Sequence, residues 1–180
     1  MMEDLSFHIL DIVENAIAAG AKRVIIAVNE NEKRDILTFR VTDDGCGMSA
    51  EDMGKAFNPF FTTKRKKTGL GLALLAQTAE TCGGKVTLES APHKGTKVAA
   101  RFRFGHIDRP PLTKMTETVM MLVFGHSEID FRYRHRRNGR DFAFSSQNFM
   151  ESRGSGGPEL IREVRKELRA GLKRIGAGAP

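Results

Sequence analysis

Hydrophobic positions recur along this chain with two periods, one typical of helices and one typical of strands. Near the N-terminus they repeat every three or four residues and predict an amphipathic helix, whose apolar face holds Leu5, Ile9, Ile12, Val13, Ala16 and Ile17. Gly20 is placed to end this helix. Apolar and polar residues then alternate in "RVIIAVN" and "DILTFRVTD", which predict two strands joined by a polar turn.

The same signals continue as far as residue 104. They predict a short helix over 50–57 capped by Ser49 and Asp52, a loop over 58–71, a helix over 70–82, and strands over 85–90 and 96–104. This order of elements predicts a layer of helices on one face of a sheet built from hairpins. We therefore expect an α+β fold, a two-layer α/β sandwich.

After residue 104 the pattern changes. A linker over 106–111 precedes a predicted helix over 112–125 and a hairpin over 128–144, with Asn138-Gly139 as a type I′ turn. A Gly-rich tether over 151–158 leads to an amphipathic helix over 159–175, whose apolar side we expect to dock on this domain or on a partner protein. The predicted units are 1–104, a helix-plus-hairpin extension over 105–150, and the tether with its helix over 151–180.

Composition limits the possible classes of protein. Hydrophobic residues make up 40% and charged residues 28% of the chain, as in soluble globular proteins. No apolar run approaches the ~20 residues of a membrane span, and the acidic start is not a secretory signal. Two cysteines, Cys46 and Cys82, lack the spacing of metal ligands. We expect a cytoplasmic protein without a membrane partner.

The net charge of +7 is unevenly distributed. Residues 1–104 hold 15 basic and 13 acidic side chains, whereas residues 105–180 hold 14 and 9. In the predicted hairpin, Arg132, Arg134 and Arg136 share the face opposite Phe131, Tyr133 and His135. Such a face occurs in nucleic-acid-binding proteins and also on ordinary solvated strands, and we favour the solvated strand.

Asp43 raises the question of function. The two-residue period places its carboxylate on the apolar face of its strand, where an unpaired charge costs several kcal/mol or more. Gly45 and Gly47 follow and leave the backbone bare. A structural turn explains this pattern, and so does a slot for a flat heterocycle with an exocyclic amino group, such as adenine.

A second pair of glycines, Gly69 and Gly71, opens the helix predicted over 70–82. Bare amides at a helix N-terminus form an anion site, and the basic run 64–67 stands just before them. A solvated basic loop is the alternative. On the first helix, Asp4, His8, Asp11 and Asn15 form a polar stripe. Asn15 is either an oxygen ligand for nucleotide-bound Mg²⁺, with Asp11 polarising a water molecule, or an ordinary surface residue.

Together these segments resemble a known superfamily. "HILDIVENAIAAGA", "DDGCGM", "FNPFFTTK" and "TGLGLALL" are similar, in order, to the N, G1, F and G2 boxes of the GHKL (Bergerat-fold) ATPases, which include histidine kinases and MutL. The resemblance implies that Asn15 coordinates Mg²⁺ and that Asp43 binds the adenine amino group. It further implies an ATP site formed with Gly45, Gly47, Met48, Phe57, Lys64, Thr68, Gly69, Leu70, Gly71, Leu72 and Thr96.

The sequence departs from the superfamily pattern in three ways. It begins at the N box, so we expect no phosphoacceptor hairpin before it; for His8 we expect a packing role, because it lies within the N-box helix. Ala19 replaces a basic residue often found four positions after the N-box asparagine. Asp11 stands where MutL-like proteins carry a glutamate base. Glu14 has the side chain of that base, but it leaves the helix about 100° away from Asn15.

The sequence thus predicts an Mg·ATP-dependent, histidine-kinase-like catalytic domain that acts in trans on a partner protein, with Asp11 or Glu14 as the catalytic acid–base group. Phosphoryl transfer in such a domain rests on positioning and charge neutralisation. The alternative is a regulatory module that binds ATP without turnover. A nucleic-acid-linked, MutL-like ATPase is a weaker alternative. A homodimer is also possible.

Overall fold

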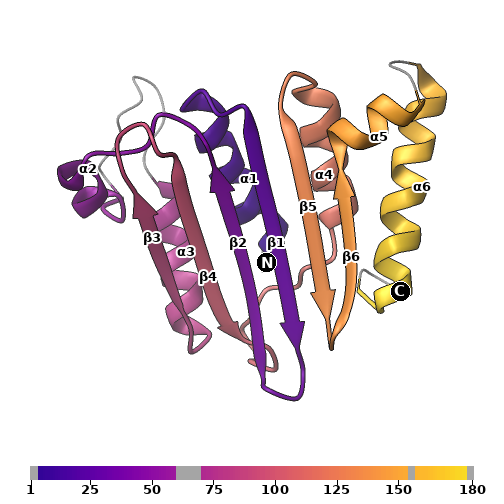
Figure 1. The fold of residues 1–180 in the computed structure, drawn as a ribbon. Coiled ribbons are helices and arrows are strands. Elements are labelled where there is room, and N and C mark those ends of the chain that lie inside the picture. The colour runs from indigo at the N-terminus through magenta and orange to yellow at the C-terminus, as the bar shows by residue number, and fades with distance from the viewer. Residues whose placement is uncertain (1–3, 60–69, 154–156, 178–180) are drawn as a thin grey trace.

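The computed structural model describes residues 4–59, 70–153 and 157–177, which form a mixed sheet covered on one face by helices (Figure 1). The strands are β1 (Arg23–Asn31), β2 (Ile36–Asp43), β3 (Lys85–Ser90), β4 (Thr96–Arg103), β5 (Asp130–Arg137) and β6 (Arg140–Ser145). The helices are α1 (Leu5–Ala18), α2 (Ala50–Lys55), α3 (Leu70–Thr81), α4 (Met115–Gly125), α5 (Ser146–Arg153) and α6 (Pro158–Ile175).

The six strands follow the order β3-β4-β2-β1-β5-β6. Contacts of α1 with α3 and α4, and of α4 with α6, give a helix layer in the order α3, α1, α4, α6. Figure 1 shows the sheet in front of α1, α3 and α4, so that its other face is open. This arrangement confirms the predicted α+β fold with two layers and a C-terminal extension.

The extension joins the sheet through its own hairpin. β5 pairs in parallel with β1 over eight positions, from Arg23↔Asp130 to Glu30↔Arg137. All the other strand pairs are antiparallel. The sequence did not predict this parallel pair, and it makes one continuous sheet out of the strands before and after residue 104.

Strict alternation of burial produces the core. In β2, Leu37, Phe39 and Val41 are buried under the helices, whereas Arg40 is exposed on the open face. The apolar face of α6 packs against β6, and a methyl group at Gly171 would overlap the ring of Phe142. The final helix is therefore docked on this domain, which is one of the two outcomes that its sequence allowed.

Local sequence signals explain the ends of several elements. Asp4 caps α1, because its Oδ1 accepts the Ser6 N–H at 2.9 Å while its Oδ2 accepts the Thr113 N–H at 2.8 Å. Asn138 and Gly139 both have positive φ, as the predicted type I′ turn requires. Helix α5 was not predicted, and its last residues occupy the start of the predicted tether.

The length and composition of the described helices distinguish them from membrane-spanning helices. Among the described residues, no helix combines the length and the apolar character that crossing a bilayer requires.

Candidate nucleotide site

Asp43 ends β2 with its side chain on the buried side of the sheet. Its Oδ1 accepts the Gly45 N–H at 2.9 Å, and the Thr96 backbone also hydrogen-bonds the carboxyl group. Burial raises the pKa of Asp43 above that of a free carboxyl group, although the Gly45 and Thr96 donors act in the opposite direction. Asp43 is thus a buried acceptor of two backbone N–H groups at the end of a central strand.

The turn after Asp43 is packed too tightly for side chains. Gly47 has a φ of +68°, and a methyl group there would overlap the Ala91 carbonyl oxygen. At Gly45 a methyl group would lie 3.0 Å from the Ala19 Cβ and from Asp43 Oδ1. The Cys46 N–H donates to the Ala19 carbonyl at 2.9 Å. The end of α1, the turn after β2 and the β3–β4 turn therefore meet beside Asp43.

Hydroxyl groups hold the β3–β4 turn in place. Ser90 Oγ accepts the Met48 N–H at 2.9 Å and donates to the Gly95 carbonyl at 2.9 Å. It also lies 3.0 Å from Thr96 Oγ1. This cluster brings Met48 and Thr96, two of the predicted site residues, to Asp43.

The second part of the site lies where α1 meets α3. Asp11 and Asn15 are exposed on α1, and a methyl group at Gly71 would stand 3.4 Å from Asp11 Oδ2. The first turn of α3 contains Leu70, Gly71 and Leu72 and no acidic residue, so its N–H groups and dipole favour an anion. The carboxylate of Asp11 is thus adjacent to the electropositive first turn of α3.

Other predicted residues lie elsewhere. Glu14 turns toward α4, where its Oε1 is 3.8 Å from His126 Nε2. Phe57 is half-buried just after α2. His8 lines a groove of about 330 Å³ beside α3. Lys64, Thr68 and Gly69 lie outside the described residues.

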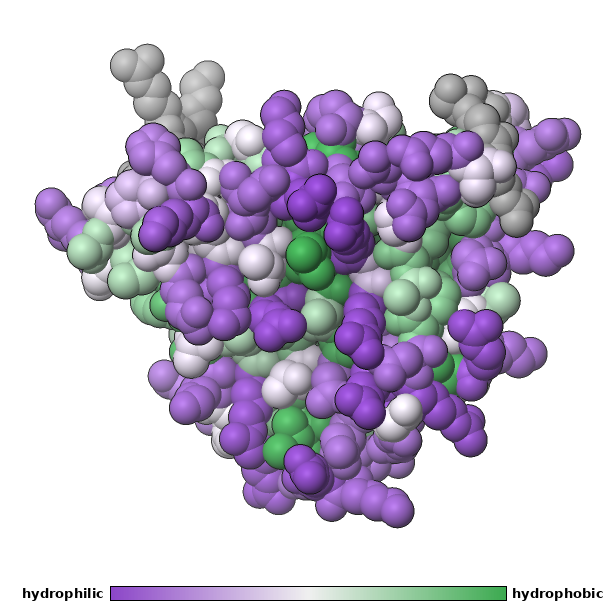
Figure 2. Space-filling view, in the orientation of Figure 1, coloured by the Kyte–Doolittle hydropathy of each residue, from purple (hydrophilic) through white to green (hydrophobic). Residues whose placement is uncertain are grey.

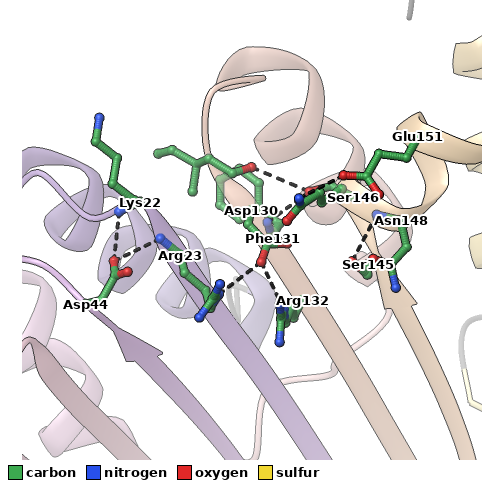
Figure 3. A network of polar contacts seen from close by, with 12 residues as sticks. Lys22, Arg23, Asp44, Asp130, Phe131, Arg132, Ser145, Ser146, Asn148 and Glu151 are labelled. Carbon is green, nitrogen blue, oxygen red and sulfur yellow. Dashed lines mark hydrogen bonds and ion pairs between the residues drawn. The ribbon is translucent and has the colours of Figure 1, made fainter. Parts of the chain in front are cut away.

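A polar network connects the site to the extension (Figure 3). Asp44 Oδ1 accepts the N–H groups of Lys22 and Arg23 at 2.8 and 2.9 Å. The Arg23 Nε donates to Asp130 Oδ2 at 3.0 Å, and the Arg132 Nε donates to the same oxygen at 2.9 Å. The residue next to Asp43 is therefore linked through β1 to the first residues of β5.

The residues present fit an Mg·nucleotide. The glycine turn at Gly45 and Gly47 presents backbone rather than side chains beside the carboxyl group of Asp43, which is an acceptor for an exocyclic amino group. No group of three or more His, Cys, Asp or Glu side chains within the described part of the chain is arranged to hold a metal. A single oxygen donor such as Asn15 suits Mg²⁺, which takes most of its other ligands from phosphates and water.

Sequence reasoning missed Ser90, Gly95 and the structural role of Ala19. Gly95 carries the only available signal, since a glycine in a short turn between strands often marks a positive φ, and here φ is +75°. Ser90 has the pattern of an ordinary strand residue, and its partners come from two other segments, the turn after β2 and the start of β4.

Comparison with known proteins identifies the first part of the chain. The family described as "Histidine kinase-, DNA gyrase B-, and HSP90-like ATPase" matches residues 3–106. The sensor histidine kinase ZraS of Escherichia coli (strain K12) is 36% identical over 88 residues, which are 49% of this chain and 19% of that protein. ZraS of Klebsiella oxytoca is 40% identical over 88 residues, 48% of this chain and again 19% of that protein. The chain thus spans less than a fifth of these curated relatives.

The fold is similar to that of solved structures over a longer region. The Aquifex aeolicus MutL ATPase domain complexed with ADP superimposes with a TM-score of 0.57 at 18% identity, covering 92% of this chain and 70% of that one. The N-terminal domain of a DNA repair protein has the same TM-score at 14% identity, covering 85% and 57%. Both structures cover a larger fraction of this chain than residues 3–106, so the similarity of fold includes part of the extension. The chain belongs to the family of histidine kinase-, DNA gyrase B- and HSP90-like ATPases, and its residues 3–106 form the ATP-binding module of that family.

Proposed function

We propose that this chain binds Mg·ATP and either hydrolyses it or transfers its terminal phosphoryl group in trans to a partner protein. The observation that carries the proposal is the pairing of two half-sites: the buried carboxyl of Asp43 beside a bare glycine turn, and Asp11 beside the N-terminus of α3. The first suits a purine and the second suits a phosphate chain. Both lie at the ends of elements that one core holds together.

Each residue has a proposed role. Asp43 accepts the adenine amino group, while Gly45, Gly47, Met48 and Thr96 shape the adenine pocket, with Phe57 at its border. Asn15 holds Mg²⁺, and Leu70, Gly71 and Leu72 direct the N–H groups of α3 toward the phosphates, together with Lys64, Thr68 and Gly69. Bound Mg·ATP supplies the phosphoryl group; Asp11 accepts the proton of the attacking hydroxyl or water at its carboxylate.

Transfer of a phosphoryl group is supported by the similarity to sensor histidine kinases. His8, on the N-box helix, lines the groove beside α3 and is half-exposed. We therefore infer that the phosphoryl acceptor lies on a separate protein in the cytoplasm rather than on this helix.

A regulatory module without turnover is the second candidate, and one observation favours it. Glu14, the longer acid of α1, turns away from α3 toward His126. This leaves the shorter Asp11 as the acid beside Gly71. In this case ATP binding itself would change the affinity of the chain for a partner.

Phosphate release by the purified chain in Mg·ATP tests the choice between the two. If Asp11 is the base, Asp11→Asn should lower the rate of release by about a hundredfold or more, the usual contribution of a general base. Affinity for a non-hydrolysable ATP analogue should change little, because Asp11 is not placed at the adenine.

Glu14→Gln serves as the matched control on the same helix and should leave the rate unchanged. Tight nucleotide binding without phosphate release, with or without Asp11, would favour the regulatory module. A parent chain that binds no nucleotide would overturn both candidates.

A further inference from the structure

The face of the sheet that no helix covers is strongly basic. Alternating residues of β1 to β5 direct lysine and arginine side chains away from the helix layer, and Figure 2, drawn from the open side, shows a mainly hydrophilic surface with small apolar areas. Acidic residues on this face are fewer, namely Glu89, Asp130 and Asp141. The open face therefore has a positive excess.

The arginines that stand out in the sequence already have acidic partners within the molecule. Asp141 pairs with Arg134 at 3.0 Å and with Arg136 at 3.7 Å. Asp130 pairs with Arg132 at 2.9 Å. The arginine side of β5 thus forms a mixed surface of opposite charges, as the solvated-strand interpretation expects.

Three other cations lack such partners. Lys85 on β3, Arg101 on β4 and Arg40 on β2 are exposed, and within the described part of the chain no carboxylate lies at ion-pair distance from any of them. We call these three residues the cationic triad. Their nearest neighbours on the β4 side, Lys97 and Arg103, pair with Glu89 and Asp35. On the open face, the cations without an acidic partner among the described residues are therefore neighbours on β2, β3 and β4.

The strand register holds the triad together. Lys85 and Arg101 are direct cross-strand partners, and two like charges in this arrangement destabilise a sheet. Arg101 faces Thr38 and Arg40 faces Ala99, which makes Arg101 and Arg40 diagonal neighbours at roughly 7–8 Å. An anion placed between these side chains would relieve their repulsion.

We propose that the cationic triad is a docking site for an extended acidic segment of a partner protein. Carboxylates at alternate positions of an extended chain lie about 6.5–7 Å apart, which is close to the diagonal spacing of Arg101 and Arg40. One carboxylate bridges Lys85 and Arg101, and the next binds the guanidinium of Arg40. Thr38, Thr87 and Ala99 between them are small, so the segment can lie flat on the sheet.

A carboxylate ligand fits this face better than a nucleic acid. Every aromatic side chain of the six strands is buried in the described structure, so none is available to stack on bases. Asp130 and Asp141 would repel a continuous phosphate backbone laid along β5. Separate carboxylates can contact the triad and avoid these acids.

Fluorescence anisotropy with a labelled peptide of alternating glutamate and serine tests the proposal. We expect binding at about 50 mM salt that weakens at about 200 mM, because exposed charges are screened. The double variant Arg40→Gln/Arg101→Gln should bind about tenfold more weakly or worse. The same peptide with glutamine in place of glutamate should not bind.

Arg132→Gln/Arg134→Gln is the matched control, because it removes the same charge from the same face but spares the triad; its affinity should stay within about twofold of the parent. Equal losses in both double variants, or no binding of the acidic peptide, would overturn the proposal. So would tighter binding of duplex DNA that the control variant abolishes, which would assign the face to nucleic acid. None of these binding measurements requires ATP turnover, so their outcome is independent of the proposed catalytic role.

Discussion

Glu30 on β1 and His135 on β5 lie 105 residues apart in the chain, yet a 2.7 Å contact joins Glu30 Oε1 to His135 Nε2 in the buried interior. On the other side of the ring, His135 Nδ1 is 2.6 Å from the hydroxyl group of Tyr133. Burial, with a smaller contribution from Glu30, raises the pKa of Tyr133 and keeps its phenol protonated. The tautomer with Tyr133 donating to Nδ1 and Nε2 donating to Glu30 satisfies all three groups.

Removing Glu30 should weaken the parallel pair of β1 and β5. Glu30→Ala leaves a buried imidazole without its partner, so we expect unfolding free energy to fall by about 2–4 kcal/mol. Denaturant titration followed by circular dichroism measures this loss. Glu32→Ala is the control, because Glu32 also contacts β5 through Arg137 but at an exposed position. Equal losses of unfolding free energy in the two variants would show that the buried contact contributes no more to stability than the exposed one.

Asp43 and Asp44 are neighbours with opposite pKa shifts. Burial is the largest influence on both carboxyl groups: at Asp43 it prevails and raises the pKa, whereas at Asp44 the N–H groups of Arg23 and Lys22 outweigh it and lower the pKa. Ionisation of Asp43 therefore destabilises the fold as the pH rises through its folded pKa. Ionised Asp44 stabilises the fold at neutral pH, and this contribution is lost as the pH falls through its folded pKa.

Asparagine substitutions should separate these effects. The stability of Asp43→Asn relative to the parent should be higher at about pH 7 than at about pH 3, because the variant has no buried carboxyl group to ionise. Asp44→Asn should show the reverse dependence. Thermal unfolding at the two pH values measures both. If the relative stabilities of both variants changed in the same direction between the two pH values, the assignment of the two environments would be wrong.

The same variants should differ in nucleotide binding. Asp43→Asn presents an amide donor where the adenine amino group requires an acceptor, so affinity for a non-hydrolysable ATP analogue should fall by about a hundredfold. Asp44→Asn should keep most of the affinity, since Asp44 bonds backbone groups of β1. Isothermal titration calorimetry gives both values, and normal affinity in Asp43→Asn would remove the proposed adenine contact.

The glycine turn should be intolerant of even one methyl group. Gly47→Ala combines a positive φ with overlap on the Ala91 carbonyl, and we expect a loss of about 1–3 kcal/mol together with weaker nucleotide binding. Gly54→Ala is the control: it lies in α2 with open space around it and should gain about 0.5–1 kcal/mol. Chemical denaturation compares the two, and a neutral Gly47→Ala would mean that the turn adapts.

Local patterns predicted much of this structure. The alternation that placed Leu37, Phe39 and Val41 on one face also placed Asp43 at the site, and Asn138-Gly139 predicted its hairpin. The pairing of β5 with β1 could not be predicted in this way, because alternation shows which face is buried and not which strand lies alongside. Ser90 escaped for a similar reason, since its function depends on Met48 and Gly95 arriving from other segments.

The central position of β1 has a consequence for synthesis on the ribosome. Arg23 meets Asp130 only 107 residues later, so the strands before residue 104 emerge while one long edge of β1 still lacks its neighbour. At about 5–20 residues per second the nascent chain waits several seconds in this state. During that time the backbone of β1 is open to foreign strands, and the hairpin that follows ends this exposure.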